Sequence, residues 1–151
     1  MTDVLLASDA DWVIQEVNAA LSGPDTTVRV VRAGLAVAAA VEASAPDLVV
    51  LDLQIGNMGG MAACIDLHLE AGAGRLPHVP VLMLLDRAAD VFLARRSEAE
   101  GWLVKPLDPF SLARAAELLM SGGTMTPQPD DDDATDQPED QAANEAGAEV
   151  A

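Results

Sequence analysis

The chain has 151 residues, which suffices for one domain with a hydrophobic core and hardly for two. Half of the residues are hydrophobic but only 3% are aromatic, so the core must consist mainly of Ala, Val, Leu and Ile. The formal net charge of −17 repels phosphate backbones, and we therefore predict that the protein binds no nucleic acid.

Cysteine content and hydropathy indicate where the protein resides. The single cysteine, Cys64, excludes an internal disulfide and fits a reducing compartment. The first residues, MTDVLLASDADW, lack the basic start of a signal peptide, and no stretch approaches the roughly 20 apolar residues of a membrane span. These features predict a soluble, cytoplasmic protein that makes no membrane contact.

Short apolar runs alternate with helical patterns over the first 121 residues. We expect strands over residues 4–7, 28–31, 48–51, 81–85 and 102–104. We expect helices over residues 10–21, 34–44, 60–71, 87–98 and 109–120. This alternation predicts the α/β class, with a doubly wound five-stranded parallel sheet of strand order 2-1-3-4-5 and five helices on its two faces, a flavodoxin-like fold.

Residues 122–151 have a different composition from the rest of the chain. They contain 9 acidic residues, no Lys or Arg, and almost no large apolar side chain. Such a segment cannot offset the entropy that it would lose on ordering. We therefore predict one domain over residues 1–121 and a disordered acidic tail over residues 122–151.

Charged side chains follow three of the expected strands. Asp9 follows the first strand, Asp52 ends the third, and Lys105 ends the fifth. Open α/β sheets bind ligands beyond the carboxyl ends of the strands, where the strand order reverses. The sequence therefore predicts that these three residues meet in one crevice. Taken singly, each also has a structural interpretation: a helix cap for Asp9, a turn cap for Asp52 and a surface ion pair for Lys105.

Residues 3–121 resemble the receiver domain of response regulators. The segment LVVLDLQIGNMGG is similar to the family's phosphoacceptor strand and loop, with Asp52 at the acceptor position and Gly60 at the closing glycine. The segment VPVLMLL is similar to the fourth strand, and GWLVKP to the end of the fifth, with Trp102 at the position of the family's switch aromatic. The resemblance also implies a cis peptide bond before Pro106.

This resemblance implies a phosphoprotein of a two-component or phosphorelay system, and not an enzyme that acts on an external substrate. A histidine kinase or phosphotransfer protein would transfer a phosphoryl group to Asp52, and the aspartyl phosphate would control contacts with a target protein that the sequence does not identify. Magnesium, held by Asp9, Asp52 and the backbone carbonyl of Gln54, would supply positive charge together with Lys105.

The sequence departs from the family pattern on both sides of the crevice. The family usually has two adjacent acids after the first strand, where this chain has Ser8 and Asp9, so we expect weakened magnesium binding. Leu85 stands where the family has a Thr or Ser hydroxyl that couples phosphorylation to movement of the aromatic, here Trp102. Leucine donates no hydrogen bond, and its bulk can fill the space that the aromatic enters. Asp86 adds an acid that opposes a phosphoryl group or replaces the missing metal ligand, and we favour the first.

Two functional interpretations stay open. The first is an atypical, stand-alone receiver that is phosphorylated on Asp52 but has a weakened metal site and switch. The second is a pseudo-receiver that binds its partner without phosphorylation. We favour the first because the acceptor itself is retained. A separate pair, Cys64 and His68, has the spacing of two metal ligands on one helix, but helix packing is the better interpretation.

Overall fold

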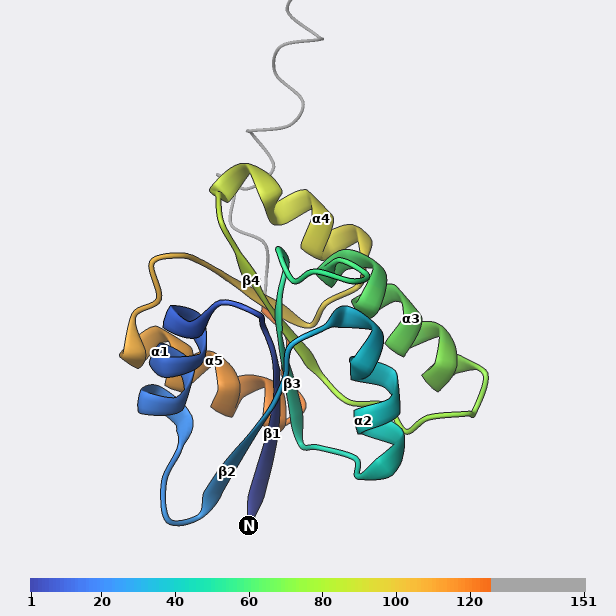
Figure 1. The fold of residues 1–151 in the computed structure, drawn as a ribbon, viewed down its shortest axis with the longest axis horizontal. Coiled ribbons are helices and arrows are strands. Elements are labelled where there is room, and N and C mark those ends of the chain that lie inside the picture. Colours follow the sequence, from blue (N-terminus) through green and yellow to red (C-terminus); the bar gives the residue numbers. More distant parts are fainter. Residues whose placement is uncertain (126–151) are drawn as a thin grey trace, which may run out of the picture.

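The structure is a computed structural model that describes residues 1–125, and its centre is a five-stranded parallel sheet (Figure 1). The strands are β1 (Thr2–Ala7), β2 (Thr26–Val31), β3 (Leu48–Asp52), β4 (Val81–Leu85) and β5 (Gly101–Val104). Their order is β2-β1-β3-β4-β5, and every neighbouring pair is parallel. The predicted fold class and strand order are confirmed.

Helices cover both faces of the sheet (Figure 1). They are α1 (Asp11–Leu21), α2 (Val37–Ala43), α3 (Gly60–Gly72), α4 (Val91–Arg96) and α5 (Pro109–Met120), with short 3₁₀ helices η1 (Gly34–Ala36) and η2 (Ala88–Asp90) before α2 and α4. Helices α1 and α5 pack on one face, and α2, α3 and α4 pack on the other. Within residues 1–125, no helix is long and apolar enough to cross a membrane.

The central strands divide their side chains between two cores. Leu51 and Leu85 pack with residues of α2, α3 and α4, whereas Val50 and Leu84 pack with residues of α1 and α5. Every residue of β3 and of β4 is buried. Each fully buried Val or Leu side chain stabilises the fold by about 1.5–3 kcal/mol, and this two-sided burial explains why both strands are continuous apolar runs.

Helix α4 differs most from its predicted extent, and α5 agrees best. The helix expected over residues 87–98 is divided into η2 and a six-residue α4. Glu98, at φ +63°, takes the left-handed conformation that ends a helix. Helix α5 begins as predicted, because the Asp108 carboxylate accepts a hydrogen bond of 3.1 Å from the backbone N–H of Ser111, with Pro109 in the first turn.

The chain stays in contact with the sheet as far as Met125, beyond the predicted domain end at residue 121. The backbone N–H of Met125 donates to the Glu100 carbonyl at 2.9 Å, and the Met125 thioether lies 3.4 Å from the backbone nitrogen of Trp102. A Cβ added to Gly101 would lie only 2.7 Å from this sulfur, so glycine makes the contact possible. Residues 126–151 of the predicted acidic tail lie outside the described residues.

Candidate functional site

Asp52 is a buried carboxylate with a hydrogen-bond donor on each oxygen. The residue ends β3 and is 1% exposed. Its Oδ1 accepts hydrogen bonds from the Lys105 ammonium at 2.8 Å and from the Gln54 backbone N–H at 3.1 Å. Its Oδ2 accepts a hydrogen bond from the Ser8 hydroxyl at 2.8 Å. Burial of a charge is costly unless it is paired and hydrogen-bonded, and these donors meet that requirement.

The parallel sheet brings these side chains together. Ser8 directly follows β1, Asp52 ends β3, and Lys105 directly follows β5, so all three stand at the carboxyl ends of strands, on one rim of the sheet. The predicted meeting of Asp52 and Lys105 is therefore present. The bond between Lys105 and Pro106 is cis, as the resemblance implies.

Asp9 does not cap the first helix. The cap position of α1 is Ala10, which makes no side-chain cap hydrogen bond; its backbone N–H donates to Ser8 Oγ at 3.2 Å. The Asp9 carboxylate instead accepts a hydrogen bond of 3.1 Å from the backbone N–H of Gly56. Asp9 thus contacts the loop of residues 53–59, the same loop whose Gln54 N–H contacts Asp52.

Two close backbone approaches fix this loop. A Cβ at Gly60 would lie 2.6 Å from the Asp52 carbonyl oxygen, which explains why glycine closes the loop. A Cβ at Gly34 would lie 1.7 Å from the carbonyl oxygen of Met58. Asn57 and Met58 both have positive φ, at 52° and 73°, a strained conformation that the surrounding contacts must hold.

Lys105 is held between two carboxylates. Its Nζ lies 2.8 Å from Asp52 Oδ1 and 2.6 Å from Asp86 Oδ1, and its side chain is only 10% exposed. Burial lowers the pKa of Lys105, but the hydrogen bonds to Asp52 and Asp86 outweigh it and raise the pKa above its ordinary value. The ammonium also lies 5.5 Å from the ring centroid of Trp12, a half-exposed residue of α1 that sequence reasoning missed.

Leu85 and Trp102 belong to the same hydrophobic core. Leu85 is fully buried, and Trp102 is 7% exposed. Both pack in the core beneath α2, α3 and α4. The structure therefore places the two predicted switch residues in one core.

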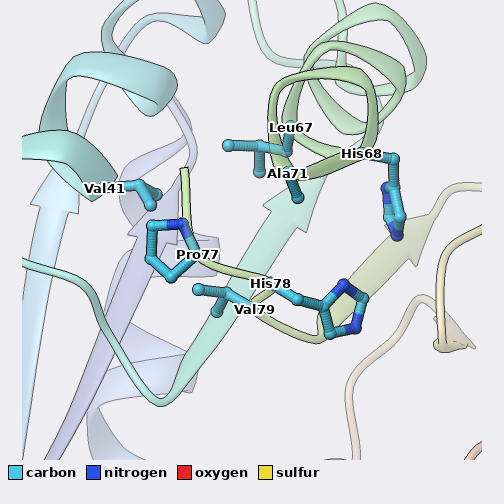
Figure 2. A pocket seen from close by; sticks show the side chains of 7 residues that line it. All are labelled: Val41, Leu67, His68, Ala71, Pro77, His78 and Val79. Atoms are coloured by element: carbon cyan, nitrogen blue, oxygen red, sulfur yellow. The ribbon is translucent and has the colours of Figure 1, made fainter. Parts of the chain in front are cut away.

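A second polar cluster lies at the opposite rim, where β4 begins. His68 Nε2 lies 2.9 Å and His78 Nε2 lies 3.3 Å from Glu100 Oε1, and Glu100 Oε2 accepts the backbone N–H of Val81 at 2.7 Å. Figure 2 shows His68 on α3 and His78 on the segment before β4, both lining one small pocket. Sequence reasoning missed Glu100, because an acid 32 residues from His68 in the chain gives no local signal.

Both ring nitrogens of His68 face hydrogen-bond acceptors, an arrangement that favours the imidazolium form. Nδ1 lies 2.8 Å from the Cys64 carbonyl oxygen, and Nε2 faces the Glu100 carboxylate, so both ring nitrogens need a proton. The Cys64 thiol and the Glu100 carboxylate raise the pKa of His68 to about 11. The contact between Cys64 and His68 is therefore part of an ion-paired packing cluster.

The donor chemistry of the Asp52 site fits magnesium. Asp9 and Asp52 offer carboxylate oxygens, and Gln54 offers a backbone carbonyl, the hard oxygen ligands that this ion prefers. Among residues 1–125, no group of three or more His, Cys, Asp or Glu side chains is placed to hold a metal ion. Magnesium needs no such group, because it keeps several waters and often binds only one or two carboxylates.

Comparison with known proteins identifies the family. The family model of the response regulator receiver domain matches residues 4–117. The chain belongs to this family. Receiver domains are signalling modules that histidine kinases phosphorylate, not enzymes acting on an external substrate.

Similar proteins include whole response regulators and isolated receiver domains. The chain is 30% identical over 111 residues to the DNA-binding response regulator MtrA of Mycobacterium tuberculosis, covering 72% of this chain and 46% of MtrA. It is 29% identical over 109 residues to the transcriptional regulatory protein CseB of Streptomyces coelicolor, covering 71% of this chain and 44% of CseB. This receiver therefore spans about half the length of these relatives.

Two solved structures share the fold. The chemotaxis response regulator CheY4 of Vibrio cholerae is 23% identical with a TM-score of 0.68, covering 78% of this chain and 97% of CheY4. The receiver domain of the sensor histidine kinase PA1611 from Pseudomonas aeruginosa, which has a magnesium ion in its active-site cleft, is 20% identical with a TM-score of 0.70, covering 80% of this chain and 98% of that domain.

Proposed function

We propose that this receiver accepts a phosphoryl group on Asp52 from a histidine kinase or phosphotransfer protein and signals through protein–protein contacts, with a weakened metal site and a weakened switch. One observation carries the proposal: the buried Asp52 carboxylate at the end of β3 is paired with the Lys105 ammonium at 2.8 Å. A nucleophile and a fixed cation on one rim are what transfer of an anionic group requires.

In the proposed step, a carboxylate oxygen of Asp52 attacks the phosphorus atom of the partner's phosphohistidine. An O–P bond forms while the P–N bond breaks, and the electron pair of that bond returns to the partner's imidazole. Asp52 becomes an acyl phosphate. Because one anion approaches another, the ammonium of Lys105 and the backbone N–H of Gln54 lower the barrier by fixed positive charge and fixed dipoles.

Asp9, Asp52 and the Gln54 carbonyl would hold magnesium in this receiver. When bound, the ion supplies further positive charge for the phosphoryl oxygens. Ser8 supports a weakened site, because its hydroxyl adds no charge and already donates to Asp52 Oδ2 at 2.8 Å. The affinity for magnesium should therefore lie below that of a site with an additional carboxylate.

The core around Leu85 supports a weakened switch. Leu85 has no hydroxyl to bond a phosphoryl oxygen, and Trp102 is already buried in the same core before any phosphorylation. Without that hydroxyl, a phosphoryl group on Asp52 lacks the contact that would couple it to movement of Trp102. The pairing of Lys105 with Asp86 favours a second candidate function, a pseudo-receiver that binds its partner without phosphorylation.

Intact-mass measurement after incubation with acetyl phosphate and Mg²⁺ tests the proposal. We expect an adduct of one phosphoryl group on the wild-type chain and no adduct on Asp52→Asn. An unphosphorylated wild-type chain, also after incubation with histidine kinases of the source organism, would favour the pseudo-receiver. An adduct that persists in Asp52→Asn would place the acceptor elsewhere.

A further inference from the structure

Asp86 and Lys105 are neighbours that the sheet register prescribes. In the parallel pair of β4 and β5, Leu85 is in register with Val104. Asp86 directly follows β4 and Lys105 directly follows β5, so the two residues are the next pair along the strands. The backbone N–H of Lys105 donates to the Leu85 carbonyl at 2.8 Å, which extends the ladder to this point. The ion pair of 2.6 Å between Asp86 Oδ1 and Lys105 Nζ thus rests on two adjacent backbones.

The structure gives Asp86 no helix to cap. The cap position of η2 is Arg87, which makes no side-chain cap hydrogen bond and pairs instead with Asp90 at 2.9 Å. The Asp86 side chain is 42% exposed, so its removal leaves no buried cavity. Its carboxylate therefore acts chiefly on the charge of Lys105.

We propose that Asp86 is a built-in competitor of the phosphoryl group for Lys105, and that it slows phosphorylation of Asp52. The inference rests on the proposed function of Asp52 as an acceptor. An ammonium has three N–H donors, and in this structure one faces Asp52 and a second faces Asp86. An incoming phosphoryl oxygen must displace the Asp86 carboxylate or approach Lys105 beside it, as one anion beside another.

Charge and exposure decide which contact yields. Asp52 is buried and accepts hydrogen bonds on both carboxylate oxygens. Asp86 is partly exposed, so water can hydrate its carboxylate when the contact with Lys105 breaks. When a phosphoryl group binds, the ion pair between Lys105 and Asp86 is therefore the one that breaks. Asp86 is a positioning residue, because it acts through Lys105 and forms no bond to the phosphoryl group.

The variant Asp86→Asn tests this competition, since asparagine keeps the shape of the side chain and removes its charge. We expect the initial rate of Asp52 phosphorylation by acetyl phosphate, followed by intact mass, to rise about tenfold, which corresponds to about 1.4 kcal/mol in the barrier. Asp86→Glu should restore the slow rate. Asp25→Asn, which removes the same charge from an exposed residue at the opposite rim of the sheet, should leave the rate unchanged.

A second measurement avoids the chemistry of the phosphodonor. Beryllofluoride mimics a phosphoryl group on a carboxylate without a leaving group, and Trp12 fluorescence in a Trp102→Phe background reports its binding near Lys105. Asp86→Asn should bind it about tenfold more tightly.

The two measurements separate the inference from the proposed function. Equal rates and equal beryllofluoride affinities in wild type and Asp86→Asn, with Asp52 phosphorylated in both, would overturn the inference about Asp86 but not the proposed function of Asp52. A rise of the same size in Asp25→Asn would overturn it as well. Absence of an Asp52 adduct in every variant would overturn the proposed function itself.

Discussion

The Ser8 hydroxyl donates a hydrogen bond of 2.8 Å to Asp52 Oδ2, and both residues are at most 1% exposed. A neutral donor thus occupies the position beside the acceptor where an acid would add charge for a metal ion. The same oxygen therefore has a fixed partner when no cation is bound. This hydrogen bond explains how the buried carboxylate is tolerated without magnesium. It also lowers the free energy gained when magnesium binds, because the ion must compete with the hydroxyl for the same oxygen.

Replacement of Ser8 by aspartate should exchange stability for metal affinity. In Ser8→Asp, a second buried carboxylate faces Asp52, so we expect magnesium to bind about tenfold more tightly or better. Without magnesium, the free energy of unfolding should fall by about 2 kcal/mol. Trp12 fluorescence, in a Trp102→Phe background, gives the affinity, and urea unfolding gives the stability. Ser8→Ala is the control, and equal magnesium affinities for the two variants would contradict the argument.

Leu85→Thr should restore part of the switch at a cost in stability. Leu85 is fully buried, so the smaller threonine leaves a cavity and a hydroxyl, and we expect the free energy of unfolding to fall by about 2–3 kcal/mol. Phosphorylation should then change hydrogen exchange in α4 more than it does in wild type. Leu85→Val controls for lost volume without a hydroxyl. The coupling argument fails if Leu85→Thr alters neither phosphorylation nor its effect on α4.

The ion pair of His68 and Glu100 should make stability depend on pH. The folded pKa of His68 is about 11 against an ordinary 6.5, so its contribution is complete below pH 6.5 and is lost as the pH rises towards 11. Burial raises the pKa of Glu100, but hydrogen bonds from His68 and from the Val81 N–H outweigh it and lower the pKa. The contribution of Glu100 is therefore lost as the pH falls below 4.5.

The variant His68→Gln measures this contribution. We expect it to lose about 2 kcal/mol of unfolding free energy at pH 6 and less at pH 9. The loss is smaller at pH 9 because the stabilisation that protonated His68 gives the wild type falls as the pH rises. Urea unfolding at the two pH values gives the difference. His78→Gln, which removes the more exposed imidazole beside the same carboxylate, should change stability much less. A loss for His68→Gln that is the same at both pH values would exclude a titrating ion pair.

A side chain at Gly34 should displace the loop that carries the site. The added Cβ of Gly34→Ala would lie 1.7 Å from the Met58 carbonyl oxygen, so the backbone must move. We expect a loss of about 2–3 kcal/mol and weaker magnesium binding, since the displaced loop carries the N–H groups that contact Asp9 and Asp52. Gly23→Ala, with nothing within 4 Å of the new Cβ, is the matched control. Equal thermal unfolding of the two variants would show that the loop adapts freely.

The sequence predicted the sheet because β3 and β4 are buried on both faces and must be continuously apolar. It predicted the meeting of Asp52 and Lys105 because parallel strands end on one rim. It missed the ion pair between Lys105 and Asp86, which depends on the register of β4 with β5. It also overestimated the length of α4, because the left-handed Glu98 that ends the helix is not a glycine or an asparagine and leaves no signal.

Met125 should extend the folded domain beyond residue 121. Its side chain packs against the core of α1 and α5, and its sulfur lies 3.4 Å from the backbone nitrogen of Trp102. Because the side chain is only partly buried, we expect Met125→Ala in the full chain to lose about 1 kcal/mol of unfolding free energy. Met120→Ala, on an exposed face at the end of α5, should lose none. Equal unfolding free energies for the two variants would favour the domain boundary predicted at residue 121. The expected difference would instead make residues 122–125 part of the folded domain, so that the acidic tail begins no earlier than residue 126.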